Sequence, residues 1–223
     1  MTGIALAYTL RAMNAIAPVD PTTQDRFILR QRIRLVINQY EFSLPNPEDE
    51  KEAGQPFCFV EQKRFKFKED IRFFTDSTKS TEILRIKARQ RFDPRARYDV
   101  TTPDGAKIGE IQKVFGKSLL RSTYTVFDAS GNQVATVAER SLPVALFRRF
   151  VGFIPYVGDF ADWLPIAYDF DFKRGEDLLG TNVRRRWKWR DVYTIDMTPD
   201  QQRTVDRRLV LAIAVGQDAL QAR

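Results

Sequence analysis

The chain has 223 residues, of which 43% are hydrophobic and 29% charged, with a formal net charge of +7 and 17 phenylalanines. This composition is typical of a globular domain rich in strand-favouring aromatic residues. The chain has no histidine and a single cysteine, Cys58, which excludes His-based catalytic triads, transition-metal sites and an internal disulfide. A lone cysteine favours a reducing compartment, so we expect a cytoplasmic protein, with peripheral attachment to a membrane as a further option. The positive charge is compatible with a polyanion or an anionic membrane surface as partner.

Residues 1–24 are predicted to form an N-terminal helical extension and linker. Residues 1–17 are mostly apolar, but no basic segment precedes them, so a signal peptide does not fit. Two hypotheses stay open: a helix packed on the domain surface, or a helix that docks on a membrane or a protein partner. Pro18 and Pro21 mark the linker, and the main domain is expected over residues 25–223.

From Phe27 onward the pattern changes to short runs that alternate apolar and polar residues, which is typical of antiparallel strands. The central region also contains a repeat with a period of 26 residues, in which Tyr98 corresponds to Tyr124 and Gly105 to Gly131. Each glycine falls in a turn signal, where a residue with positive φ suits a tight hairpin. The repeat therefore predicts a recurring two-stranded unit.

A stretch at about 142–165 interrupts the strand pattern and is predicted to be a helical insertion. Strand patterning then resumes and continues to Ile195. The last element is predicted as a helix over about 199–221, with Thr198 as its N-cap and Pro199 and Asp200 in the first turn. Between Leu209 and Val215 it is apolar on every side, so it must be enclosed. This apolar run is too short to cross a bilayer, and we predict a core helix surrounded by strands.

Two motifs and the terminal helix resemble the LURP-one-related family, which is grouped with phospholipid scramblases and tubby C-terminal domains. The matching residues are Gly180-x-x-Val183-Arg184-Arg185-x-Trp187, Asp191-x-Tyr193-x-Ile195-Asp196, and the helix end Asp218-Ala219-Leu220. The resemblance implies a mainly β fold (α+β): a closed antiparallel barrel of about twelve strands around a buried C-terminal α-helix. It also implies an association with phospholipids, although the cysteine cluster of scramblases is missing here.

Three features could carry function, and each has a purely structural alternative. The basic run 184–190 could bind lipid headgroups or nucleic-acid phosphates, or it could be a solvated strand face. The insertion combines basic, apolar and Trp residues, as interfacial helices do, but it could instead cap one barrel mouth. Carboxylates between Asp159 and Asp177 could hold Ca²⁺, but their spacing matches no known calcium loop.

The sequence therefore favours a non-enzymatic binding module without cofactor, metal or catalytic residues, and a peripheral association with an anionic phospholipid membrane surface. The expected anion-binding residues are Arg148, Arg149, Arg184, Arg186, Lys188 and Arg190, and the expected apolar membrane-interface residues are Phe147, Phe150, Phe153 and Trp163. One alternative is a protein-interaction or scaffold role through residues 1–17 or 142–165. The other is nucleic-acid binding through the strand 184–190.

Overall fold

A computed structural model describes most of the predicted barrel domain. The described residues are 19–33, 37–63, 70–89, 97–114, 122–140, 169–185 and 191–221. The predicted N-terminal helix, the helical insertion at 142–165 and residues 186–190 of the basic run lie outside this part of the chain.

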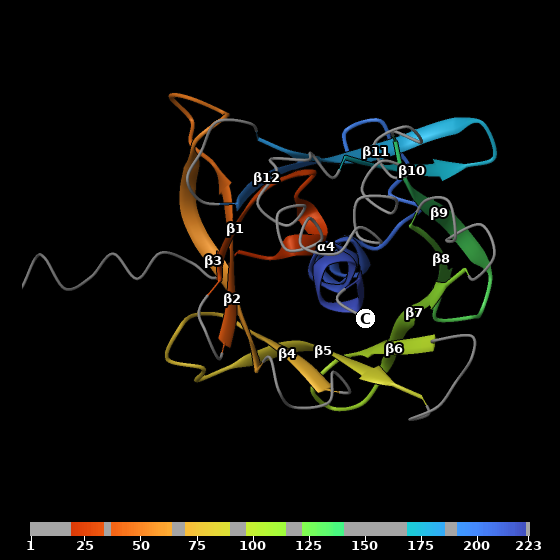
Figure 1. The fold of residues 1–223 in the computed structure, drawn as a ribbon, viewed down its shortest axis with the longest axis horizontal. Coiled ribbons are helices and arrows are strands. Elements are labelled where there is room, and N and C mark those ends of the chain that lie inside the picture. The colour runs from red at the N-terminus through yellow and green to blue at the C-terminus, as the bar shows by residue number, and fades with distance from the viewer. Residues whose placement is uncertain are drawn as a thin grey trace, which may run out of the picture.

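Twelve antiparallel strands form one closed barrel in which each strand pairs with its neighbours in the sequence and β1 pairs with β12 (Figure 1). Their bounds are β1 (Arg26–Ile33), β2 (Ile37–Pro45), β3 (Ala53–Lys63), β4 (Asp70–Phe74), β5 (Glu82–Ala88), β6 (Arg97–Thr101), β7 (Lys107–Lys113), β8 (Thr123–Asp128), β9 (Gln133–Glu139), β10 (Phe170–Arg174), β11 (Asp177–Arg184) and β12 (Asp191–Asp196). A short 3-10 helix, η1 (Pro21–Thr23), precedes β1. The closure leaves no unpaired sheet edge, and it confirms the predicted fold class.

The 26-residue repeat corresponds to two hairpins with the same register. Tyr98 lies opposite Ile111 in β6–β7, and the equivalent Tyr124 lies opposite Val137 in β8–β9. Both hairpins also carry a register shift at the same position, just after Val100 in the first and just after Val126 in the second. The repeated glycines adopt positive φ angles of 92° and 88°, as the turn signals predicted.

Helix α4 (Arg207–Gln221) runs through the middle of the ring of strands, where Figure 1 shows it end-on. Every side chain from Leu209 to Val215 is at most 5% exposed, so the prediction of an enclosed apolar helix is confirmed. The barrel approaches the helix closely at Gly109 of β7. A Cβ atom there would lie 2.8 Å from Leu209 Cδ1 and would also collide with the Phe127 carbonyl oxygen.

The predicted start of this helix was wrong, because α4 begins at Arg207 rather than at Pro199. Residues after Thr198 form turns instead: the Arg203 N–H donates to the Asp200 carbonyl oxygen at 2.9 Å, and Arg203 then adopts a φ of +52°. A left-handed residue cannot continue a right-handed helix. The N-cap is Asp206, whose Oδ1 accepts a 2.8 Å hydrogen bond from the Arg208 N–H.

The up-and-down order gives the barrel two chemically different ends. We call one end the turn rim: it holds the connections β2–β3, β4–β5, β6–β7, β8–β9 and β10–β11, together with the start of α4. We call the other end the link rim: strands β1, β3, β5, β7, β9 and β11 end there, and the links that follow them each contain residues outside the described part of the chain. Helix α4 runs from the turn rim to the link rim.

Candidate functional site

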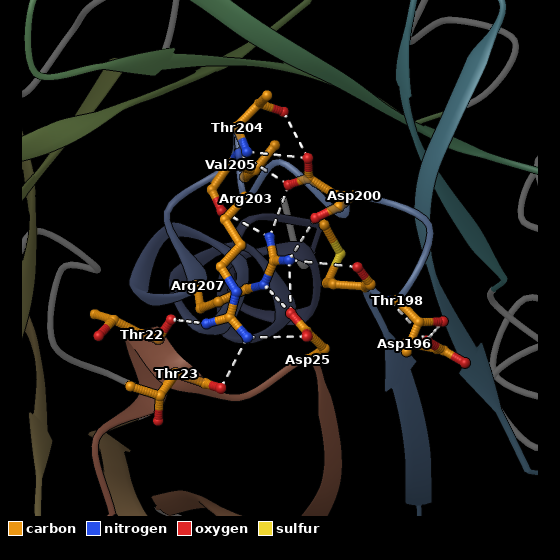
Figure 2. Close-up of polar contacts among 11 residues, drawn as sticks. Thr22, Thr23, Asp25, Asp196, Thr198, Asp200, Arg203, Thr204, Val205 and Arg207 are labelled. Atoms are coloured by element: carbon orange, nitrogen blue, oxygen red, sulfur yellow. Dashed lines mark hydrogen bonds and ion pairs between the residues drawn. The ribbon is translucent and has the colours of Figure 1, made fainter.

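A buried arginine fixes the first turn of α4 at the turn rim (Figure 2). The side chain of Arg207 is 1% exposed, and its guanidinium lies between the carboxylates of Asp25 and Asp200, each at 2.7 Å. The same guanidinium donates to the backbone carbonyls of Met197, Asp200 and Val205. All three of its nitrogens therefore have acceptors, which a buried charge requires.

Asp200 organises the chain between β12 and α4. Its carboxylate accepts hydrogen bonds from the backbone N–H groups of Thr204 and Val205 at 2.9 and 3.0 Å, besides the bond from Arg207. Burial alone would raise the pKa of the Asp200 carboxyl, but these hydrogen bonds hold its pKa below the ordinary value. Arg203 adds a clamp to the start of the barrel, with bonds to the carbonyls of Thr22 and Thr23.

This cluster of Asp25, Asp200, Arg203 and Arg207, which we call the helix anchor, is a structural device. Each of its guanidinium groups is bound within the protein, so little capacity remains for a ligand. The sequence pattern did not predict this cluster, because Asp200 matches a first-turn helix residue. The available signal was Arg207 itself, a charge placed two residues before a fully apolar helical run.

The lumen becomes polar toward the link rim. Asn182 of β11 donates a 2.9 Å hydrogen bond to Gln217 of α4, and both side chains are at most 4% exposed. Gln31, Gln62 and Glu139 are also buried, near the ends of β1, β3 and β9. The Asn182 Oδ1 and the Gln217 Nε2 have no hydrogen-bond partner among the described residues. Buried amide groups normally bond to something, so this end of the lumen holds polar atoms that the described residues leave without a partner.

The links of the two rims differ strongly in their balance of acidic and basic residues. The five links at the turn rim contain seven acidic and two basic residues: Glu48, Asp49, Glu50, Glu52, Asp76, Asp104 and Glu176 against Lys51 and Lys79. The five short links at the link rim have the opposite balance. They contain thirteen basic and two acidic residues: Arg34, Arg64, Lys66, Lys68, Arg89, Arg91, Arg95, Lys117, Arg121, Arg185, Arg186, Lys188 and Arg190 against Glu69 and Asp93. The sixth and longest link, residues 140–169, has equal numbers of each sign.

The structure divides the predicted basic run at its beginning. Arg184 shares the face of β11 with Asn182, which is the lumen side, and its backbone N–H donates to Asp169 Oδ1 at 3.2 Å. Arg185 lies on the outer side, where its Nε–H donates to the Thr194 hydroxyl at 3.1 Å and its guanidinium lies 3.6 Å from the Glu52 carboxylate. The adjacent residues Arg184 and Arg185 therefore lie on opposite sides of the barrel wall.

The other predicted site residues lie outside the described part of the chain. They are Arg148, Arg149, Arg186, Lys188 and Arg190, and the apolar set Phe147, Phe150, Phe153 and Trp163. Within the described residues, no group of three or more His, Cys, Asp or Glu side chains is placed to hold a metal ion. None of the helices in the described ranges is both long and apolar enough to pass through a membrane. Cys58 is buried, and burial raises the pKa of its thiol.

These features define a closed twelve-stranded barrel with a central helix, whose connections at one end have a strongly basic sequence, and this architecture is consistent with a binding module. A family model gives the affiliation: residues 58–218, well over half of the chain, match LURP-one-related. The chain belongs to the LURP-one-related family, as the sequence motifs predicted. Neither the curated proteins nor the solved structures contain a significant match to it.

Proposed function

We propose that this protein is a non-enzymatic binding module whose link rim docks on an anionic phospholipid surface. The observation that supports this most directly is the opposite charge of the two rims. Each Lys or Arg held near an anionic membrane contributes about 1 kcal/mol of attraction. The short links contain thirteen basic residues. The two that the structure describes, Arg89 and Arg185, form ion pairs within the protein, so the attraction is expected to come mainly from the other eleven.

The barrel provides a rigid frame for such a surface. Strands β1, β3, β5, β7, β9 and β11 fix the points at which the basic links leave the ring, and these points all lie at one end of the barrel. The links of the turn rim are mostly acidic, which favours an orientation with the basic links toward an anionic surface, although Glu52 of the β2–β3 link lies beside Arg30 and Arg185 on the barrel wall. Helix α4 fills the apolar lumen, which in many barrels is the ligand cavity. Binding at an outer surface is thus favoured over enclosure of a small molecule.

Co-sedimentation with vesicles tests the proposal. The wild-type protein is expected to pellet with vesicles containing 30% phosphatidylserine and to remain in the supernatant with pure phosphatidylcholine. The triple variant Arg186→Glu, Lys188→Glu and Arg190→Glu should lose most of this pelleting, and the loss should resemble that caused by 0.5 M salt. A matched triple variant at the turn-rim end, Lys51→Glu, Lys173→Glu and Arg174→Glu, changes the net charge equally and should still pellet.

Other outcomes point to the alternatives. Equal pelleting with neutral and anionic vesicles, or none with either, contradicts the lipid proposal. Salt-sensitive binding to RNA or DNA that the link-rim variant alone loses would favour the nucleic-acid alternative. Salt-insensitive capture of a protein that depends on residues 1–17 would favour the scaffold alternative.

A further inference from the structure

The tip of the β2–β3 hairpin, residues 46–52, folds back over the outer face of β1. Two register shifts in β2, on either side of Ser43, bend this hairpin, as β-bulges do. Ile28 lies on the outer face of β1, where a side chain would face solvent if nothing covered the barrel wall. It is nevertheless completely buried, and Ser43 beside it is 1% exposed. The bend therefore brings the acidic sequence of the tip onto the barrel wall, and we call residues 46–52 the acidic tip.

Three arginines on this wall receive the carboxylates of the acidic tip. Arg26 lies 2.5 Å from Glu50, while Arg30 and Arg185 lie 4.0 and 3.6 Å from Glu52. Arg30 and Arg185 flank the same residue of β12, because Arg30 is paired with Val192 and the Arg185 N–H donates to the Val192 carbonyl. We call Arg26, Arg30 and Arg185 the arginine row.

Two members of the arginine row still have free hydrogen-bonding capacity. The Arg26 Nε and the Arg185 Nη2 are buried atoms without a hydrogen-bond acceptor in the described part of the chain. Arg26 also lies 3.4 Å from the Asp196 carboxylate, which is within ion-pair range but makes no hydrogen bond to this nitrogen. Buried guanidinium donors without an acceptor are costly. The acidic tip thus neutralises the charge of the row, and Glu50 accepts a hydrogen bond from Arg26 Nη1, but the Arg26 Nε and the Arg185 Nη2 remain without an acceptor.

We propose that the arginine row is a binding site for phosphate groups, such as those of lipid headgroups, and that the acidic tip occupies it as a displaceable internal substitute. Guanidinium groups bind phosphate through paired hydrogen bonds, and a phosphate has more acceptor oxygens than the single carboxylate that Glu52 offers to two arginines. Where the phosphate belongs to a lipid headgroup, the inference rests on the proposed function, because it adds to that function a phosphate site that the acidic tip regulates.

The exposure of the ion pairs makes the tip displaceable. The carboxylates of Glu50 and Glu52 are 70% and 42% exposed, and exposed pairs of this kind hold weakly. Arg185 is less exposed, at 16%, whereas Arg26 and Arg30 are 41% and 38% exposed. Loss of the tip contacts should therefore leave the arginine row in place and available.

The experiment compares the double variant Glu50→Gln/Glu52→Gln with a matched control, Glu48→Gln/Glu176→Gln. The control removes the same two charges from exposed residues at the same rim, neither of which forms an ion pair within the described ranges. Binding is measured by titration calorimetry with inorganic tripolyphosphate and by co-sedimentation with phosphatidylcholine vesicles containing 20% phosphatidic acid. Relative to wild type, the tip variant should bind both probes roughly three- to tenfold more tightly, and the control should change much less. Adding Arg185→Gln to the tip variant should cancel the gain.

Each outcome separates this inference from the proposed function. If vesicles bind to no variant but tripolyphosphate binding rises in the tip variant alone, the inference stands and the lipid proposal falls. If wild type, tip variant and control bind vesicles equally and tripolyphosphate binding is unchanged, the lipid proposal stands and the inference is overturned. An equal gain in the tip variant and the control reports only net charge and also overturns it. If neither tripolyphosphate nor vesicles bind to any of the proteins, both the inference and the lipid proposal are overturned.

Discussion

The two ends of the barrel differ in how completely the protein's own groups satisfy one another. At the turn rim, glycines with positive φ lie in three of the five connections, and the buried charge of Arg207 is bound by two carboxylates and three carbonyls. At the link rim the lumen contains amide groups without hydrogen-bond partners among the described residues, and the links are rich in Lys and Arg.

This difference suggests that stability and binding are assigned to opposite ends of the molecule. A rim whose polar groups are satisfied internally gains little from a ligand, whereas an excess of one charge is costly to the protein and favourable for an oppositely charged partner. Substitutions that break the helix anchor should therefore mainly change the free energy of unfolding, whereas substitutions of the Lys and Arg residues in the link-rim connections, or of the carboxylates of the acidic tip, should mainly change binding. The following predictions test that separation, from the largest expected effect to the smallest.

Replacing Arg207 with Met should cause the largest loss of stability. It leaves the Asp200 carboxylate buried without its charged partner, and breaking a buried pair in this way costs about 3–5 kcal/mol. The control is Arg208→Met, because Arg208 forms a partly exposed pair with Asp206 and its loss should cost less than about 1 kcal/mol. Urea unfolding followed by fluorescence measures both values. Similar losses in the two variants would show that the helix anchor has no special role.

Adding a methyl group at Gly109 should have the next largest effect. The new Cβ would collide with the Phe127 carbonyl oxygen and with the Leu209 side chain, and overpacking of this kind costs about 1–3 kcal/mol. Gly131→Ala is the comparison: nothing lies within 4 Å of its Cβ position, but its φ is +88°, so we expect a loss of about 1 kcal/mol from backbone strain. Thermal unfolding of both variants provides the measurement.

At the link rim, Gln217→Leu should cost about 1–2 kcal/mol, since it leaves the buried Asn182 amide without its hydrogen bond. The double variant Asn182→Leu/Gln217→Leu removes both polar groups and should recover most of this loss. A double-variant cycle in urea gives the coupling energy. If the double variant is no more stable than the single one, the lumen amides are tied to other groups and do not act as a pair.

Acid should destabilise the protein only at low pH. The pKa of Asp200 is depressed in the folded state, so its contribution is fully present above the unfolded carboxyl pKa of about 3.9. That contribution is lost as the pH falls through the lower folded value. Urea unfolding at a series of pH values from 7 to 2.5 should show the decline at the acidic end, and Asp200→Asn should flatten it. A decline centred near pH 6 would assign acid sensitivity to another group.

Much of the fold could be predicted because it depends on local patterns. The 26-residue spacing of Tyr98 and Tyr124 gave the hairpin repeat, and the apolar run from Leu209 to Val215 predicted a helix that needs enclosure on all sides. The strand number and the closure came from the family resemblance. The start of α4 was predicted wrongly because Thr198, Pro199 and Asp200 match a helix start, while the left-handed Arg203 that interrupts it has no local signature.

The candidate site was harder to predict, because it depends on contacts between distant segments. Arg26 and Glu50 lie 24 residues apart, and no periodicity joins Glu52 to Arg185. Alternation correctly separates the two faces of β11, but it does not say that Arg184 takes the lumen side. Rim charge, in contrast, follows from the sequence once the strand bounds are known.

Closure of the ring by β1 and β12 has a consequence for biogenesis. The first strand finds its second partner only after about 165 further residues have been synthesised, and the helix that fills the centre is translated later still. Until then a growing sheet presents apolar side chains with nothing to cover them, and folding through such distant contacts is intrinsically slow. We therefore expect a nascent chain of this protein to be prone to aggregation until α4 has left the ribosome.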